Sequence, residues 1–257
     1  MSIRGKEDLA LSVFWIKMIA ATSMLLDHAG MLLFPNVTWL RILGRLALPL
    51  YALCIAEGFR HTRSRVKYFL RIFILGALCQ VVYFLASEQP YLGILITFSL
   101  SILLLSLTDA LLCAVKGQKD PISCAAEKLC KRTLPRPARI VLCAALLALG
   151  FGGIILLNHF IRVDYGLTGV LFPVLVYLGG SSRPGRFGGA AAGTILLACN
   201  IEGSSTPRAW SLLALLPLCL YNGTPGKYKL KYFFYVFYPA HLVLLYGIKL
   251  LWILLAR

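Results

Sequence analysis

The stretch SVFWIKMIAATSMLLDHAGMLLF, residues 12–34, decides the fold class of this protein. Only Lys17, Asp27 and His28 in it carry an ionisable side chain. A transmembrane helix needs about 20 consecutive, mostly apolar residues. The stretch is also too long for the apolar core of a secretory signal peptide. We therefore predict a transmembrane helix that the protein retains.

The composition extends this prediction to the whole chain. Of the 257 residues, 59% are hydrophobic and 14% are charged, and the mean hydropathy is +0.80. A soluble domain is about half apolar and about a quarter charged, so lipid must cover much of this surface. We predict an all-α polytopic transmembrane bundle that forms one domain over residues 1–257. About nine spans are expected, at residues 12–34, 40–59, 67–87, 92–114, 138–158, 165–180, 186–201, 209–222 and 232–254.

The basic residues predict the orientation of these spans. With a cytoplasmic N-terminus, nineteen Lys and Arg residues fall in cytoplasmic loops and five fall in outer loops, as the positive-inside rule requires. The net charge of +16 is then first a topology signal, and it does not indicate nucleic-acid binding. Binding of anionic lipid or of an anionic cytosolic ligand is compatible with it. The longest loop, at about residues 116–138, is predicted to be a flexible cytoplasmic connector.

The eight cysteines predict neither a disulfide nor a metal site. Most lie in apolar stretches, where cysteine behaves as a small hydrophobic residue. Cys124 and Cys130 share a loop, but their spacing matches no metal-binding motif. The sequence also contains no Walker loop and no GxGxxG pattern.

Ionisable side chains inside the spans are costly in lipid and by default mark a function or a pairing. Lys17 and His28 are eleven residues apart, so they face the same side of one helix, about 16 Å apart along its axis. One interpretation is a titratable base deep in the bundle below a cytoplasmic cation. The other is a snorkelling lysine and a histidine that is hydrogen-bonded between helices.

Asp27 and His28 need partners from other helices, because neighbours on a helix point about 100° apart. Arg45 lies at a suitable depth to pair with Asp27, and His241 is also near mid-depth. These four residues are expected to converge. The alternative is a buried ion pair that is purely structural.

Two basic clusters lie at the predicted cytoplasmic mouths of the bundle. The first, GFRHTRSRVKY at 58–68, follows Glu57, and the second, KYKLKYFFYVFYPAHL, covers 227–242. Several cations at a membrane mouth suit phosphate groups. For Glu57 the alternative is a solvated helix end with a local Glu–Arg pair. In the second cluster, Tyr235 and Tyr238 share a face, and Pro239 is expected to kink the helix.

Several blocks together give the chain a resemblance to the TraX family of pilin-acetylase-like membrane proteins, within the wider acyltransferase-3 type. The wider type carries an Arg–x10–His pattern on its first helix, and here Lys17 and His28 stand at those positions. The resemblance covers nearly the whole chain. Its blocks are IKMIAATSMLLDHAG (16–30), RILGRLALPLYALCIAEGFRHTRSRVKY (41–68), TF (97–98), VDYGLTGVL (163–171) and LLALLPLCLYNGTPGKYKLKYFFYVFYPAHL (212–242).

The resemblance implies a bacterial inner-membrane enzyme that transfers an acetyl group from cytosolic acetyl-coenzyme A to an amine, with a pilin N-terminus or a small amine as acceptor. His28 would be the general base, and Asp27, Arg45 and His241 would complete the catalytic group. Tyr238 or Asn222 would polarise the thioester carbonyl, and Asp164 and Tyr165 would meet the acceptor. No metal is expected. The cosubstrate would be held by Lys17, Glu57, Arg60, His61, Arg63, Lys67, Asn222, Lys231, Tyr235 and Tyr238.

Two other functions stay open at this point. The same site could acylate a hydroxyl group of a cell-surface glycan or of a small molecule. Alternatively, the chain could be a transporter or a conjugation scaffold without enzymatic activity, which predicts no binding of coenzyme A.

Overall fold

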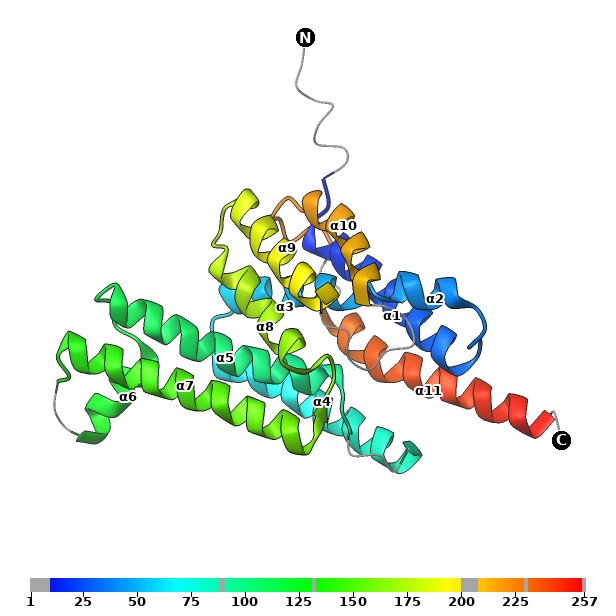
Figure 1. Ribbon diagram of the computed structural model, residues 1–257, viewed down its shortest axis with the longest axis horizontal. Coiled ribbons are helices and arrows are strands. Elements are labelled where there is room, and N and C mark those ends of the chain that lie inside the picture. Colours follow the sequence, from blue (N-terminus) through cyan, green and yellow to red (C-terminus); the bar gives the residue numbers. More distant parts are fainter. Residues whose placement is uncertain (1–9, 88–90, 131–132, 200–207, 229–230, 256–257) are drawn as a thin grey trace, which may run out of the picture. The chain divides into compact units, whose positions relative to one another are not determined.

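The computed structural model describes residues 10–87, 91–130, 133–199, 208–228 and 231–255, and most of them are helical (Figure 1). The predicted all-α fold class is confirmed. The elements are α1 (Val13–Leu32), α2 (Thr38–Gly44), α3 (Ala47–His61), α4 (Arg65–Ser87), β1 (Tyr91–Leu92), α5 (Ile94–Val115), α6 (Pro121–Cys130), α7 (Arg136–Phe160), β2 (Arg162–Val163), α8 (Gly166–Leu178), α9 (Arg183–Cys199), the 3₁₀ helix η2 (Arg208–Ala214), α10 (Leu215–Cys219) and α11 (Lys231–Leu255).

Each of the predicted spans coincides with helix in the described residues. Four helical stretches in this part of the chain are long and apolar enough to cross a bilayer: Thr38–His61, Ile94–Val115, Arg136–Phe160 and Phe233–Leu255. α8 and the η2–α10 pair are apolar but shorter than the about 20 residues that a straight crossing needs. The structure therefore has the character of a helical membrane protein.

Pro49 explains why the predicted span at 40–59 consists of two helices. It has no amide hydrogen, so it cannot bond to the carbonyl of Arg45 as a residue inside a helix would. The chain instead turns at Arg45 and Leu46, whose amides donate to Ile42 and Leu43 at 3.1 and 3.3 Å. α3 then begins at Ala47, which puts the proline in the first turn, where a helix tolerates it.

The chain divides into two compact units. We call residues 1–58 together with 175–257 the terminal unit, and residues 59–174 the central unit. α3 and α8 each contribute to both.

In the terminal unit, α1 packs against α2 and α11, while α9 packs against η2 and α10. Glycine permits the close approach of α1 and α2, because a Cβ atom at Gly44 would lie 2.4 Å from the Cβ atom of Asp27. The chain just before α1 pairs with the loop after α10. Leu11 donates to Leu220 at 2.8 Å and accepts from Asn222 at 2.9 Å.

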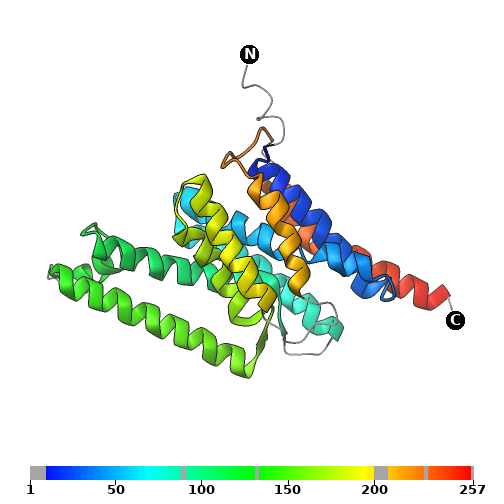
Figure 2. The ribbon, with the colours of Figure 1, turned by 45° about the horizontal axis from the view of Figure 1, so that its top comes forward.

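In the central unit, α5 packs against α4 and α7, and Figures 1 and 2 show α5 and α7 side by side. The strands β1 and β2 form a short parallel pair. The predicted connector at 116–138 contains α6, a helix that the sequence analysis did not predict. Asp120 caps it by accepting from the Ser123 amide at 2.7 Å, and Ile122 packs on the core formed by Ala110, Ala114 and Cys143.

Candidate functional site

A pair of histidines joins α1 and α11 of the terminal unit. Nδ1 of His28 lies 3.1 Å from Nε2 of His241, and the ring centroids are 5.0 Å apart. The two residues are 213 positions apart in the sequence. The structure therefore brings together two of the predicted catalytic residues.

The hydrogen bonds of the pair define which nitrogen of His28 can act as a base. Nδ1 of His241 lies 2.9 Å from the carbonyl oxygen of Phe237. A carbonyl only accepts, so this nitrogen carries the hydrogen and Nε2 of a neutral His241 carries a lone pair. Nδ1 of His28 must then be the donor, to His241 and to the Met24 carbonyl at 3.0 Å. This leaves the lone pair of His28 on Nε2.

Aromatic side chains fix the ring of His241, which is 3% exposed. Phe237 stacks on it, with centroids 5.1 Å apart, and Tyr238 meets it edge-on at 5.6 Å. His28 is half-buried. One member of the pair is therefore held rigidly, while the other keeps some access to solvent or ligand.

Asp27 pairs with Arg41, a residue that the sequence analysis did not select as a partner. Nη1 of Arg41 donates to Oδ2 of Asp27 at 3.0 Å and to its carbonyl oxygen at 3.3 Å. Arg45, the predicted partner, is buried, and its charge also acts on Asp27. Arg41 and Arg45 are four residues apart, so the spacing that selected Arg45 could equally have selected Arg41.

Glu57 is buried at 4% exposure, not solvated as the alternative interpretation required. Its Oε2 accepts from Nη1 of Arg186 at 3.3 Å and from the hydroxyl of Tyr221 at 3.1 Å. The guanidinium of Arg186 also lies 5.3 Å from the centroid of the Tyr221 ring. The arginine comes from α9, 129 residues away, so no local sequence signal could have revealed it.

We call Glu57, Arg186 and Tyr221 the Glu57 cluster. Lys17 on α1 lies near it. Its Nζ lies 5.6 Å from the centroid of the Phe234 ring. Cys54, which is buried, interacts electrostatically with both Lys17 and Glu57. Lys17, the predicted cosubstrate residue that shares a helix with His28, is therefore close to the Glu57 cluster.

The remaining predicted residues of the terminal unit lie at different depths. Oδ1 of Asn222 accepts from the amide and the hydroxyl of Thr224 at 2.9 and 2.8 Å, in the loop beside the start of α1. His28 is about 22 Å further along α1. Of the two predicted oxyanion donors, Tyr238 is thus the one near the histidines. Tyr235 is half-buried on α11, and the side chain of Lys231 lies outside the described residues.

Four predicted cosubstrate residues belong to the central unit: Arg60, His61, Arg63 and Lys67. His61, Arg63 and Lys67 are exposed. The hydroxyl of Ser64 accepts from the amide of Lys67 at 3.3 Å, which helps to cap the start of α4.

The predicted acceptor residues Asp164 and Tyr165 form a constrained turn of the central unit. Tyr165 has φ 57°, and Gly166 follows with φ 54°. A left-handed backbone is costly for a residue with a bulky side chain and occurs often at functional sites. The hydroxyl of Thr97 donates to the carbonyl of Asp164 at 3.0 Å, and that of Thr168 donates to Tyr165 at 2.7 Å.

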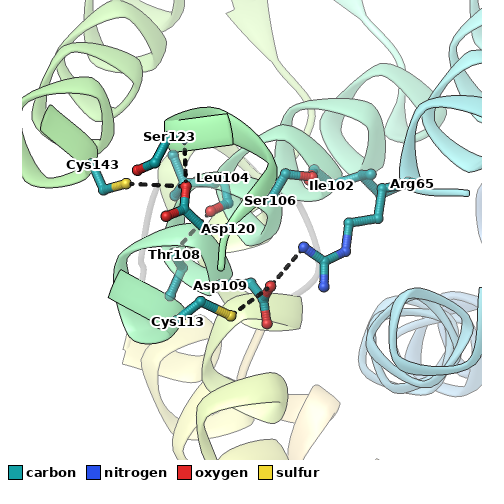
Figure 3. A network of polar contacts seen from close by, with 10 residues as sticks. All are labelled: Arg65, Ile102, Leu104, Ser106, Thr108, Asp109, Cys113, Asp120, Ser123 and Cys143. Atoms are coloured by element: carbon teal, nitrogen blue, oxygen red, sulfur yellow. Dashed lines mark hydrogen bonds and ion pairs between the residues drawn. The ribbon is translucent and has the colours of Figure 1, made fainter. Parts of the chain in front are cut away.

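Asp109 on α5 pairs with Arg65 at 2.6 Å within the central unit (Figure 3). Sγ of Cys113 lies 3.8 Å from the same carboxylate oxygen. A separate contact joins Sγ of Cys143 to Oδ1 of Asp120 at 3.7 Å. These pairings account for Asp109 as a structural group.

Within the described residues, no three side chains of the types that bind metals gather into a group, and the described cysteines are free thiols.

Comparison with known families decides where the chain belongs. The model of the TraX protein family matches residues 12–249. The chain belongs to the TraX family.

Two curated relatives of this TraX chain differ in how much they share with it. It is 29% identical to a "Probable fimbrial assembly protein FimC, serogroup H1" of Dichelobacter nodosus, over 95% of this chain and 98% of the relative. An uncharacterised protein of Rickettsia prowazekii (strain Madrid E) is 35% identical, over 26% of this chain and 25% of the relative. No solved structure matches the TraX chain.

The blocks that carried the TraX resemblance are also the parts that form these contacts. The block 16–30 holds His28, and the block 212–242 holds His241 and Tyr221. The short block 97–98 meets the block 163–171 through Thr97 and Asp164. In the terminal and central units alike, blocks that are distant in the TraX sequence are joined by polar contacts.

Proposed function

We propose that this TraX protein is a membrane-embedded acetyltransferase that moves an acetyl group from acetyl-coenzyme A to an amine. The observation that supports this most directly is the 3.1 Å contact between His28 and His241. It orients a neutral histidine so that Nε2 carries the lone pair. A general base needs such a nitrogen within reach of the proton that it removes.

In the proposed reaction, Nε2 of His28 takes a proton from the acceptor amine as the amine nitrogen attacks the thioester carbonyl carbon. The carbon–sulfur bond then breaks, and His28 returns the proton to the leaving thiolate. The products are an amide and coenzyme A. Between the two proton transfers His28 is positively charged, and the bond from its Nδ1–H to His241 becomes charge-assisted and stronger.

The side chains near the histidines support two further roles. Asp27 pairs with Arg41 directly beside His28, and we propose that this ion pair holds the site together. The hydroxyl of Tyr238 is proposed to donate to the developing oxyanion of the thioester. The polar turn at Asp164 and Tyr165 stays our prediction for contact with the acceptor.

The acceptor class follows from the name of the relative. That relative is named a probable fimbrial assembly protein, and we therefore propose a pilin-like peptide amine as the first acceptor to test. Transfer to a hydroxyl group uses the same base and remains the second enzymatic candidate. The same name also favours a third candidate, an assembly factor without transferase activity.

We further propose nine membrane crossings with a cytoplasmic N-terminus, in the bacterial inner membrane. The distribution of nineteen against five loop cations supports this orientation. In this orientation the basic loops would face the cytosol and could contact acetyl-coenzyme A there.

Acetyl transfer by purified protein tests the proposal. The full-length chain is incubated in detergent or proteoliposomes with labelled acetyl-coenzyme A and a panel of peptide amines, small amines and alcohols. We expect label in an amide, and we expect His28→Ala to lower the rate by at least about 100-fold, the usual contribution of a general base. His159→Ala is the matched control, because His159 is an exposed histidine on α7 of the central unit.

The outcomes separate the three candidates. Label in an ester supports hydroxyl acylation. No transfer and no binding of coenzyme A would leave the non-enzymatic assembly factor. Near-normal turnover in a folded His28→Ala protein would refute the role of His28 as the base.

A further inference from the structure

Two helices of the terminal unit begin on either side of one loop, residues 219–226. On one side, the amide of Val13 at the start of α1 donates to Thr224 at 2.8 Å. On the other side, Nη2 of Arg183 at the start of α9 donates to the Cys219 carbonyl at 3.2 Å. The loop is thus held between two helix N-termini, each of which carries a partial positive charge.

Cations, not acids, occupy these helix starts. Arg183 and Arg186 lie in the first turn of α9, Lys17 lies in the second turn of α1, and neither helix has an acid in its first turn. The helix dipole makes this placement unfavourable unless an anion is near. Among the described residues, Glu57 is the acid that accompanies these three cations, so the cations outnumber the acid in this part of the structure.

Arg186 has one buried donor without a hydrogen-bond partner in the described structure. Its Nη1 donates to Glu57, but its Nε is buried and has no hydrogen-bond partner among the described residues. An unsatisfied buried donor destabilises the folded protein. Glu57 and the Tyr221 ring hold the guanidinium in place, and the side chain is 14% exposed.

The loop backbone lies close to this guanidinium because residue 223 is glycine. Gly223 has φ 82°, a conformation that favours glycine. A Cβ atom there would lie 2.4 Å from Nη2 of Arg186. Helix starts, a fixed arginine and a close glycine loop are the components with which proteins bind phosphate groups.

We propose that Lys17, Arg183, Arg186 and the loop 219–226 form a binding site for a phosphate or pyrophosphate ester. Its identification with the phosphate end of the acetyl donor rests on the proposed function. Lys17 and His28 face the same side of α1, about 16 Å apart. A long cosubstrate could therefore be held by its phosphates at one end of α1 while its thioester reaches the histidines.

The phosphate can come from a soluble ester or from a lipid headgroup, and two experiments distinguish these sources. Calorimetric titration of the full-length chain in a neutral detergent uses sodium pyrophosphate and coenzyme A as soluble probes. Native mass spectrometry of the chain from phosphatidylcholine nanodiscs, with or without phosphatidylglycerol, counts retained anionic lipid.

The decisive variant is Glu57→Gln with Arg186→Gln. Arg186→Gln alone would leave Glu57 buried without its arginine and could prevent folding, whereas the double change removes both charges. We expect the double variant to unfold thermally near the wild type but to lose affinity for pyrophosphate by at least about ten-fold, the effect of one charged hydrogen bond. Arg162→Gln, which removes an exposed arginine of the central unit, should leave the affinity unchanged.

Each outcome decides the proposal. Arg186-dependent binding of pyrophosphate and coenzyme A supports a soluble ester, and Arg186-dependent retention of phosphatidylglycerol alone supports a lipid phosphate. If the folded double variant binds every probe as the wild type does, Glu57 and Arg186 are a structural pair and the proposal is wrong.

The outcomes also separate this site from the proposed reaction. Arg186-dependent phosphate binding without acetyl transfer would retain the site and refute the acetyltransferase function. Acetyl transfer with an unchanged KM for acetyl-coenzyme A in the double variant would retain the function and refute the identification of this site with the phosphate end of the acetyl donor.

Discussion

At the scale of single residues, His28 and His241 have different tasks. His28 is half-buried and presents Nε2, while His241 is enclosed by Phe237 and Tyr238 and accepts from Nδ1 of His28. Under the proposed function His241 is a positioning residue. It selects the tautomer of His28 and stabilises its charged form.

His241→Ala should therefore lower kcat for acetyl transfer by about 10–100-fold, the usual effect of losing the group that orients a functional histidine, and leave KM for acetyl-coenzyme A nearly unchanged. His241→Gln offers an amide oxygen as acceptor and should recover part of the rate. Steady-state kinetics over a range of pH would measure both effects. Since His241 stabilises the charged form of His28, its loss should move the pH profile of kcat to lower apparent pKa. If His241→Ala and His241→Gln lower kcat equally and the pH profile of kcat does not move, His241 has only a packing role.

Sequence reasoning at this scale selected the two histidines but did not select the partners of Glu57. His28 and His241 stand out because ionisable groups are rare in apolar stretches. Arg186 and Tyr221 did not, since Arg186 lies in a predicted basic loop end and Tyr221 at an apolar helix end. Only the fold reveals that both contact Glu57.

At the scale of elements, the apolar stretches located the helices, but local chemistry determined their ends. The break between α2 and α3 follows from Pro49, a signal that was present in the sequence. α6 was missed because its ten residues are short and weakly apolar. It depends on the Asp120 cap and on the contact of Ile122 with α5 and α7.

The Asp120 cap gives the connector a pH dependence. Burial would raise the pKa of the Asp120 carboxyl, but hydrogen bonds from Ser123 and Cys143 and the charge of Arg139 outweigh it, so the pKa lies below its ordinary value. A lowered folded-state pKa stabilises the fold above the unfolded pKa, and that contribution is lost as the pH falls through the folded value. α6 should therefore loosen below about pH 4, the ordinary pKa of an aspartate.

Hydrogen exchange of the α6 amides between pH 3 and pH 7, corrected for the intrinsic rate, would measure this loosening. Asp120→Asn keeps a capping oxygen without a charge, so α6 should stay protected and lose its pH dependence. Asp120→Ala should weaken the helix by about 1 kcal/mol at neutral pH, and its difference from the wild type should shrink as the Asp120 carboxyl becomes protonated. A wild-type response that persists in Asp120→Asn would assign the effect to another group.

At the scale of the whole molecule, the loop charges and the helix lengths give different answers about whether α8 and the η2–α10 pair cross the membrane. The loop cations fit nine crossings and place the C-terminus outside. α8 has 13 residues and the η2–α10 pair has 12, so each spans less than the about 30 Å of hydrocarbon if it is straight. Sequence periodicity cannot resolve this, because a short buried helix and a short crossing have the same apolar composition.

Fusions of paired reporters, one active in the cytoplasm and one outside it, test the topology. We expect cytoplasmic activity at the 116–138 connector and at residue 226, and external activity after residue 257. External activity at residue 226 together with cytoplasmic activity after residue 257 would mean that η2 and α10 do not cross the membrane. Cytoplasmic activity after residue 257 with an unchanged connector would refute the odd number of crossings.

The histidine pair also has a consequence for the biosynthesis of the protein. His28 lies on the first described helix and His241 on the last, so the pair cannot exist until the ribosome has synthesised nearly the entire chain. A nascent or prematurely terminated product would carry the base without the residue that orients it. Under the proposed function, acetyl transfer would therefore stay weak during insertion of the protein and would reach its full rate only when the final helix docks against α1.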